Sequence, residues 1–123
     1  SQRGVDANFI VDLANAVHTM ALVSDPRAME FSDQAMAYIR DHDIDDAARS
    51  YVEITRARAM LGSPKGKLPS TRQEARALVG AACERLPNGG SEAERRVAAE
   101  IFAAQRWPLP KACRSQTADS ASG

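Results

Sequence analysis

The sequence predicts an all-α fold, a compact bundle of about five helices. Apolar residues recur at spacings of three and four along most of the chain, which is the pattern of amphipathic helices. Alanine supplies much of the apolar content, and it favours helices that approach one another closely. Only 5% of residues are aromatic, which argues against a sheet. The chain of 123 residues is one domain by its length, and we expect that domain to span residues 1–114.

The first half of the chain is expected to hold two helical regions. The first covers Val5–Val23, where the apolar residues form one stripe. Asp25 then suits the N-cap of the next region and Pro26 its first helical position. That region continues to about Ile39, and residues 31–33 either lie within one helix or divide it.

A third helix is expected from Asp45 to Leu61, near the centre of the bundle. The acidic run over residues 41–46 suits the positive N-terminal end of this helix. Gly62 is expected at the C′ position, where glycine commonly ends a helix.

Two further helices are expected to begin at capping boxes, in which a serine and a glutamine or glutamate satisfy each other's backbone amides. Residues 70–73 read Ser-Thr-Arg-Gln and residues 91–94 read Ser-Glu-Ala-Glu. The fourth helix is expected to end at residues 87–90 and the fifth at the two prolines of residues 107–110. Residues 115–123 are small and polar, and are expected to form a disordered tail.

The only two cysteines, Cys83 and Cys113, are predicted to form a disulfide. They lie at the end of the fourth expected helix and just beyond the fifth, so one bridge would hold both. Closing a loop of roughly 30 residues would stabilise the fold by about 3 to 4 kcal/mol. Disulfides persist in exported proteins, which favours a mature periplasmic protein after removal of a signal peptide. The alternative to a disulfide is that both cysteines are buried free thiols.

Charge and hydropathy exclude several classes of partner. The chain has 16 Lys and Arg residues and 16 Asp and Glu residues, so no net field attracts nucleic acid. No apolar run approaches the roughly 20 residues that span a bilayer, so no membrane association is expected.

No residue pattern indicates an enzyme, a metal site or a cofactor site. The two histidines, His18 and His42, lie in the first third of the chain, far along the sequence from both cysteines. His18 is expected to be a half-buried packing residue. Alternate aspartates at positions 41, 43 and 45 resemble the start of a calcium loop, but Asp46 replaces its glycine and Val52 its final glutamate. A solvated, helix-starting acidic cluster is therefore expected there.

The loop between the third and fourth helices has two interpretations. It either only connects the helices or forms a partner-binding element, because its two prolines restrict the free ensemble while two lysines project from it. Its residues are Gly62, Ser63, Pro64, Lys65, Gly66, Lys67, Leu68 and Pro69.

Several short motifs follow one another in the second half of the chain: Tyr51-Val52-Glu53, Leu68-Pro69-Ser70, Leu78-Val79, Leu86-Pro87, Trp107-Pro108 and Cys113. Their order resembles the Tai family, small all-helical periplasmic immunity proteins that neutralise type VI secretion amidase effectors. The resemblance covers about half of the chain, from Tyr51 to Cys113. This chain departs from the family at Lys67, where the family has a cysteine, and the closing cysteine is displaced by Leu109 to Ala112.

The resemblance implies a non-enzymatic inhibitor. Family members bind peptidoglycan amidases of the NlpC/P60, papain-like type, often as dimers, and occlude the catalytic cysteine-histidine cleft with a loop. Carried over, residues 62–69 are the inserted element, with residues 87–91 as a second choice, and a homodimer is allowed. The alternative function is a periplasmic helical adaptor or structural module that binds another partner through its surface.

Overall fold

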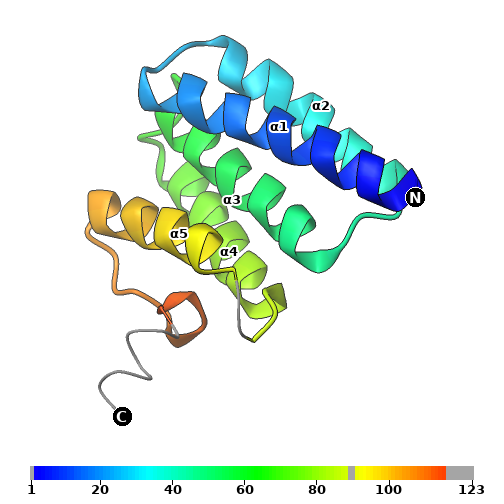
Figure 1. The fold of residues 1–123 in the computed structure, drawn as a ribbon. Helices are drawn as coiled ribbons and strands as arrows, with labels where there is room; N and C mark the ends of the chain where they lie inside the picture. Colours follow the sequence, from blue (N-terminus) through cyan, green and yellow to red (C-terminus); the bar gives the residue numbers. More distant parts are fainter. Residues whose placement is uncertain (1, 89–90, 116–123) are drawn as a thin grey trace.

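The computed structural model describes residues 2–88 and 91–115, and over these residues the chain is an all-helical bundle (Figure 1). Five α-helices and no strand occur in the described part, which confirms the predicted fold class. The helices are α1 (Gln2–Leu22), α2 (Arg27–Asp41), α3 (Asp46–Gly62), α4 (Pro69–Arg85) and α5 (Glu92–Gln105), followed by a 3-10 turn, η1 (Lys111–Cys113).

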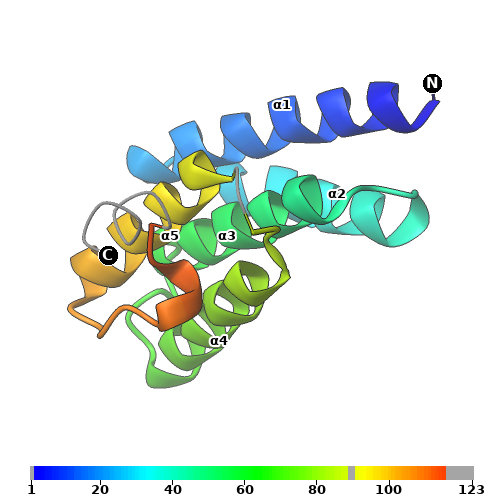
Figure 2. The same ribbon diagram turned by 60° about the horizontal axis from the view of Figure 1, so that its bottom comes forward.

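Helix α3 is the central element, as expected. It packs against α1, α2, α4 and α5, while α1 and α2 pack side by side on one of its sides. Figures 1 and 2 show α4 across α3 from α1, and Figure 2 shows α5 on the side of α3 next to α1. Helices α1 and α5 both lie on α3 without packing closely on each other, so the surface of α3 between them is left uncovered at both ends.

The core is built largely from small side chains around a few larger ones. Ile54, Val79 and Phe102 anchor its largest part, between α3, α4 and α5. Ile10 and Val52 anchor the part between α1, α2 and α3. Buried alanines fill the helix contacts elsewhere, which is how a chain with few aromatic residues can bring five helices close together.

The start of α2 lies one residue later than predicted. Pro26 is the N-cap rather than the first helical residue, although its dihedral angles are helical, and α2 begins at Arg27. The Asp25 carboxylate still accepts a 2.9 Å hydrogen bond from the Arg27 backbone N–H. Residues 31–33 do not divide the region, because α2 continues without a break to Asp41. Asp45 likewise caps α3, since its Oδ1 accepts a 2.9 Å hydrogen bond from the N–H of Ala48.

Both expected capping boxes are wrong. Helix α4 begins at Pro69, one residue before Ser70, and Leu68 precedes it in an extended conformation with no side-chain cap. Pro69 is already suited to the first helical position, which places Ser70 inside the first turn. Ser91 does precede α5, but it adopts the left-handed conformation, with φ 61°, and its hydroxyl makes no capping hydrogen bond.

The expected role of Gly62 is also wrong. Gly62 is the last residue of α3. Ser63 follows it as the C-cap and is extended rather than left-handed. The Ser63 backbone N–H and hydroxyl both donate to the Met60 carbonyl, at 3.2 and 2.7 Å. These two hydrogen bonds satisfy the end of the helix without a left-handed glycine.

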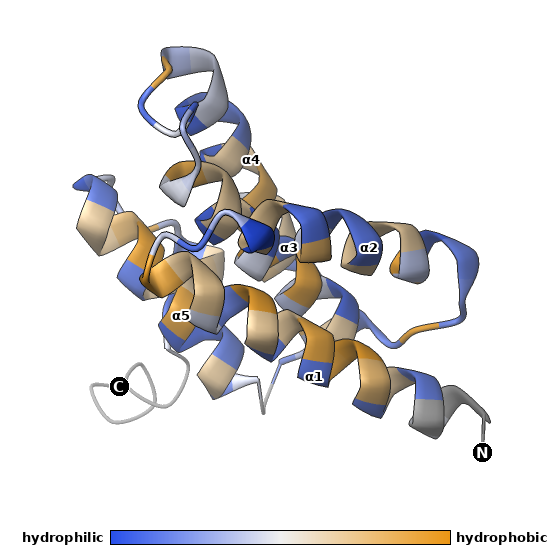
Figure 3. Cartoon of the chain, turned by 90° about the horizontal axis from the view of Figure 1, so that it is seen from above, coloured by the Kyte–Doolittle hydropathy of each residue, from blue (hydrophilic) through white to orange (hydrophobic). Residues whose placement is uncertain are grey.

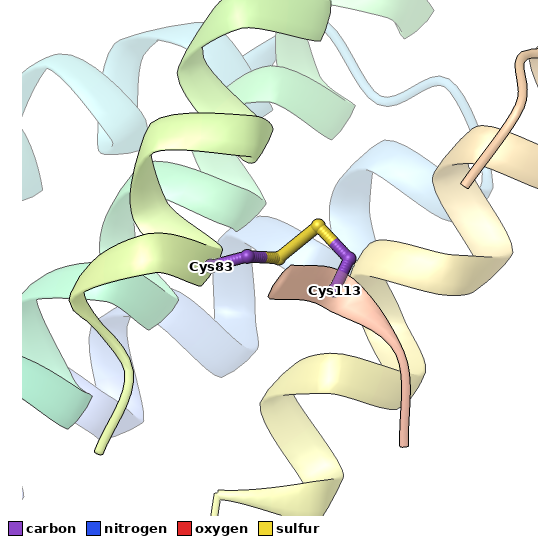
Figure 4. The surroundings of a disulfide bond; sticks show 2 residues. All are labelled: Cys83 and Cys113. Carbon is purple, nitrogen blue, oxygen red and sulfur yellow. A yellow bond between two sulfur atoms is a disulfide. The ribbon is translucent and has the colours of Figure 1, made fainter. Parts of the chain in front are cut away.

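The predicted disulfide between Cys83 and Cys113 is present (Figure 4). It joins the end of α4 to η1, with the two Cα atoms 5.1 Å apart, and both residues are buried. The intervening chain turns at Arg106, in the left-handed region, and places Trp107 edge-on against Phe102 with 5.5 Å between the ring centroids. Residues 116–123, for which disorder is predicted, lie outside the described residues.

Candidate functional site

Residues 62–69, which we call the knuckle, form a compact, turn-rich connection between α3 and α4. The Gly66 N–H donates to the Ser63 carbonyl at 2.9 Å, and the Leu68 N–H donates to the Lys65 carbonyl at 3.1 Å. These bonds close two successive tight turns. Figure 3 shows the connection and the first turn of α4 projecting beyond the other helices.

Gly66 fixes the shape of the knuckle. It is buried, and a Cβ atom on it would lie 2.0 Å from the carbonyl oxygen of Leu61 and 2.6 Å from the carbonyl carbon. No larger residue fits without moving the backbone. The knuckle is therefore folded back onto the end of α3, and little conformational entropy remains for it to lose when a partner binds.

The exposed face of the knuckle is basic around an apolar centre. Lys65 and Lys67 are exposed, and their ammonium groups make no ion pair with any residue that the structure describes. Leu68 is 49% exposed and lies directly beside Lys67, so the exposed face combines an apolar side chain with two cations. The chain contains no acidic residue between Glu53 and Glu74, so nothing nearby in sequence offsets the two lysines.

A pocket of about 500 Å³ lies beside the knuckle, at the end of the bundle where α1 turns into α2. The knuckle supplies one wall and the α1–α2 turn the other, and Ala59 of α3 also lines it. Of the residues that the structure describes, Asp25 is the only charged one that lines it, and Arg27 Nη2 lies 2.7 Å from the Asp25 carboxylate. The Arg27 hydrogen bonds lower the pKa of Asp25 to about 2. The lining residues are Ala21, Ser24, Asp25, Pro26, Ala28, Met29, Ala59, Gly62, Ser63 and Pro64.

A second, wider groove of about 730 Å³ lies between α1 and α5, over the N-terminal half of α3. Tyr51 donates a 2.6 Å hydrogen bond to Asn15 Oδ1 within it. Burial, and then the nearby carboxylate of Glu94, raises the pKa of Tyr51. None of the lysines, arginines and histidines whose side chains the structure describes lines this groove. Sequence reasoning missed it, although Asn8, Asp12 and Asn15 recur at helical spacing and would have marked a polar face of α1.

Toward the other end of the α1–α5 gap, three titratable groups come together. Arg58 Nη2 lies 3.4 Å from Glu100 Oε1. Burial, and then the charge of Arg58, lowers the pKa of His18, which is half-buried as predicted. His18 Nδ1 and Arg58 Nε are both buried and have no hydrogen-bond partner among the described residues. The cluster therefore disfavours a protonated His18.

The structure brings no catalytic set together from the residues considered in the sequence. Both cysteines are in the disulfide, so neither is available as a thiolate nucleophile. His42 stacks on Tyr38, and its Nδ1 lies 3.0 Å from the Tyr38 carbonyl oxygen. Within residues 2–88 and 91–115, no group of three or more His, Cys, Asp or Glu side chains is arranged to hold a metal ion.

The second-choice segment, residues 87–91, is only partly described, because residues 89 and 90 lie outside the described residues. Pro87 and Asn88 are exposed, and the Pro87 carbonyl accepts a 3.2 Å hydrogen bond from Arg95 Nη2.

No family model, curated protein or solved structure matches this chain. Over the part of the chain that the structure describes, none of the helices combines the length and the apolar character that crossing a bilayer requires.

Proposed function

We propose that this chain is a non-enzymatic, periplasmic immunity protein. It binds a type VI secretion peptidoglycan amidase and blocks the catalytic cysteine-histidine cleft by inserting the knuckle, residues 62–69. The amidase comes from the motif resemblance, and the mode of binding rests on the shape of the knuckle. The observation that carries the proposal is the packing of Gly66 against Leu61, which holds an exposed, basic segment in one conformation.

A preformed segment suits steric inhibition. A flexible loop would lose conformational entropy on entering a cleft, whereas a segment already closed by two turns loses little. The knuckle is anchored on α3 and α4, which together with α5 build the largest part of the core. The buried disulfide at the far end of α4 adds rigidity to the same helix and is compatible with an oxidising compartment.

Inhibition of a purified amidase tests this proposal. The enzyme encoded beside the gene is mixed with the protein, and release of fragments from peptidoglycan is measured. We expect loss of hydrolysis at equimolar protein, no hydrolysis by the protein alone, and inhibition weakened about tenfold or more by the double variant K67A/L68A. Unchanged inhibition by that variant would show that the knuckle does not block the cleft. Absence of inhibition by the wild type would show that this amidase is not the target.

A matched control lies at the opposite end of the bundle. Phe9 is 51% exposed on α1, and Arg40 is exposed near the end of α2. The double variant F9A/R40A removes one apolar and one basic side chain, as K67A/L68A does, but far from the knuckle. We expect its inhibition to equal that of the wild type. A homodimer, which the resemblance allows, is a separate prediction that light scattering tests.

The groove between α1 and α5 favours the adaptor as a second candidate. It is the larger of the two hollows and is lined by the carboxylates of Asp12, Asp45 and Glu94. An adaptor would bind its partner without blocking catalysis. Binding of the amidase with full retention of its activity would favour this function over inhibition.

A further inference from the structure

Two features of the knuckle end of the bundle lie next to each other. One is the pair of exposed lysines, Lys65 and Lys67, which have no ion-pair partner among the described residues. The other is the mostly apolar pocket, which shares Gly62, Ser63 and Pro64 with the knuckle. The projecting segment and the hollow therefore form one continuous surface.

The edge of this surface is also apolar. Val23 is 74% exposed and lies directly before the turn that lines the pocket. Leu22 is 56% exposed and lines the neighbouring smaller hollow between α1, α3 and α5. Leu68 is exposed within the knuckle itself, next to Lys67. Exposed large apolar side chains around a hollow are typical of a protein-binding site rather than of a free surface.

The surface carries a net positive charge. Among the described residues, Asp25 is the only acidic one that lines the pocket, and its ion pair with Arg27 offsets its charge. An acidic partner would gain attraction to Lys65 and Lys67 without meeting an unpaired carboxylate in the pocket, whereas a basic partner would be repelled.

We infer that the knuckle and the pocket together form one docking surface for an acidic protein, whose carboxylates face Lys65 and Lys67 and whose apolar side chain enters the pocket between the α1–α2 turn and Pro64. This inference deepens the proposed function, on which it rests, because it states the chemistry of the partner surface that receives the knuckle. It also extends the contact from residues 62–69 to the start of α2.

Binding of the amidase, measured calorimetrically at several salt concentrations, tests the charge. We expect the reversal K65E/K67E to weaken binding about tenfold or more at low salt, and the difference to shrink as salt rises. The control reversal K111E/R114E changes two exposed cations at the opposite end of α4. We expect it to change affinity less than twofold. Equal losses in the two double variants would overturn the charge assignment.

Filling the pocket tests the apolar contact. Ala28 lies at the start of α2, lines the pocket and is only 3% exposed, so A28M adds apolar volume at the wall between the pocket and the core. A21M is a second filling variant from α1. Circular dichroism and thermal unfolding identify the variants that fold. We expect about a tenfold loss of affinity in each folded variant, and wild-type affinity in a folded variant would overturn the assignment of the pocket.

A short peptide tests the docking surface independently of whether the amidase is the partner. We would titrate a capped pentapeptide with one leucine flanked by glutamates into the labelled protein and follow the amide NMR signals. We expect shifts confined to residues 62–68 and 21–29, and smaller ones with a lysine-flanked peptide. If the amidase does not bind but the acidic peptide maps to this surface, the proposed function fails and the docking surface stands. Shifts elsewhere, or equal shifts with the basic peptide, would overturn the docking surface.

Discussion

Gly66 lies against the carbonyl group of Leu61 so closely that a Cβ atom on residue 66 would be 2.0 Å from the carbonyl oxygen. This contact joins the middle of the knuckle to the last turn of α3. The backbone conformation of the knuckle is possible only because residue 66 has no Cβ atom. The shape of the proposed binding element can therefore be altered without changing any of its exposed side chains.

The first prediction compares two glycines. We expect G66A to lower the free energy of unfolding by about 1 to 3 kcal/mol, because the backbone must move to relieve the contact with Leu61. Gly80 lies inside α4, and a Cβ atom there would meet nothing within 4 Å. We expect G80A to raise the free energy of unfolding by about 0.5 to 1 kcal/mol, since alanine is the better helix former. Urea denaturation measures both.

The two variants also separate shape from stability in the inhibition assay. G66A should weaken inhibition although Lys65, Lys67 and Leu68 are all retained, and G80A should leave it unchanged. If both alanine variants change stability in the same direction, the packing described for Gly66 is wrong.

The second prediction concerns the disulfide. Replacing Cys83 and Cys113 by alanine should lower the free energy of unfolding by about 3 to 4 kcal/mol, because the bridge limits the unfolded chain. Hydrogen exchange should show faster exchange at η1, which the bridge fastens to α4. The control is the wild type under reductant, which should resemble the double variant. Two alkylatable thiols in the unreduced, unfolded protein would contradict the bridge.

The sequence predicted the helices well because each depends on local periodicity. Asp25, expected as a cap, and Asp45, expected at the first position of the third helix, each accept a backbone hydrogen bond at a helix start that follows a clear break. The serines at 70 and 91 fit the same motif, yet Pro69 starts α4 one residue earlier and Ser91 takes a left-handed turn. A capping motif shows which side chains could form capping hydrogen bonds. Whether these hydrogen bonds form depends on the conformation of the residues before the helix.

The candidate site was predicted only in part, for a different reason. The composition of residues 62–69 marked a loop, and its lysines marked it as accessible. Sequence could not show that Gly66 rather than Gly62 fixes the turn, because the requirement comes from contact with Leu61. Nor could it show the pocket, whose walls come from Ala28 on α2 and Pro64 in the knuckle, residues that only the fold brings together.

The third prediction concerns the hydrogen bond between Tyr51 and Asn15 in the α1–α5 groove. Y51F removes the hydroxyl that donates to Asn15 Oδ1 at 2.6 Å, and N15A removes the acceptor. A double-mutant cycle should give a coupling energy of about 1 kcal/mol in unfolding, as expected for one partly exposed hydrogen bond. A coupling energy near zero would show that the two groups do not interact in solution. Unchanged inhibition of the amidase by Y51F would agree with binding at the knuckle, on another part of the surface.

The fourth prediction concerns pH. Burial, and then the charge of Arg58, lowers the pKa of His18 in the folded state below its ordinary value of 6.5. The unfolded state therefore binds more protons than the folded state between the two pKa values, so the free energy of unfolding rises with pH in that window. Stability is greatest above about pH 6.5 and falls as the pH drops through 6.5 toward the lower folded value. Urea denaturation at a series of pH values measures this slope.

Substitution assigns the pH dependence to one residue. H18Q retains a polar side chain of similar reach but does not titrate, so we expect the part of the slope just below pH 6.5 to disappear. H42Q changes the exposed histidine that stacks on Tyr38 and serves as the matched control, with the slope retained. Loss of the slope in H42Q, or its persistence in H18Q, would show that the cluster of His18, Arg58 and Glu100 does not control stability in this range.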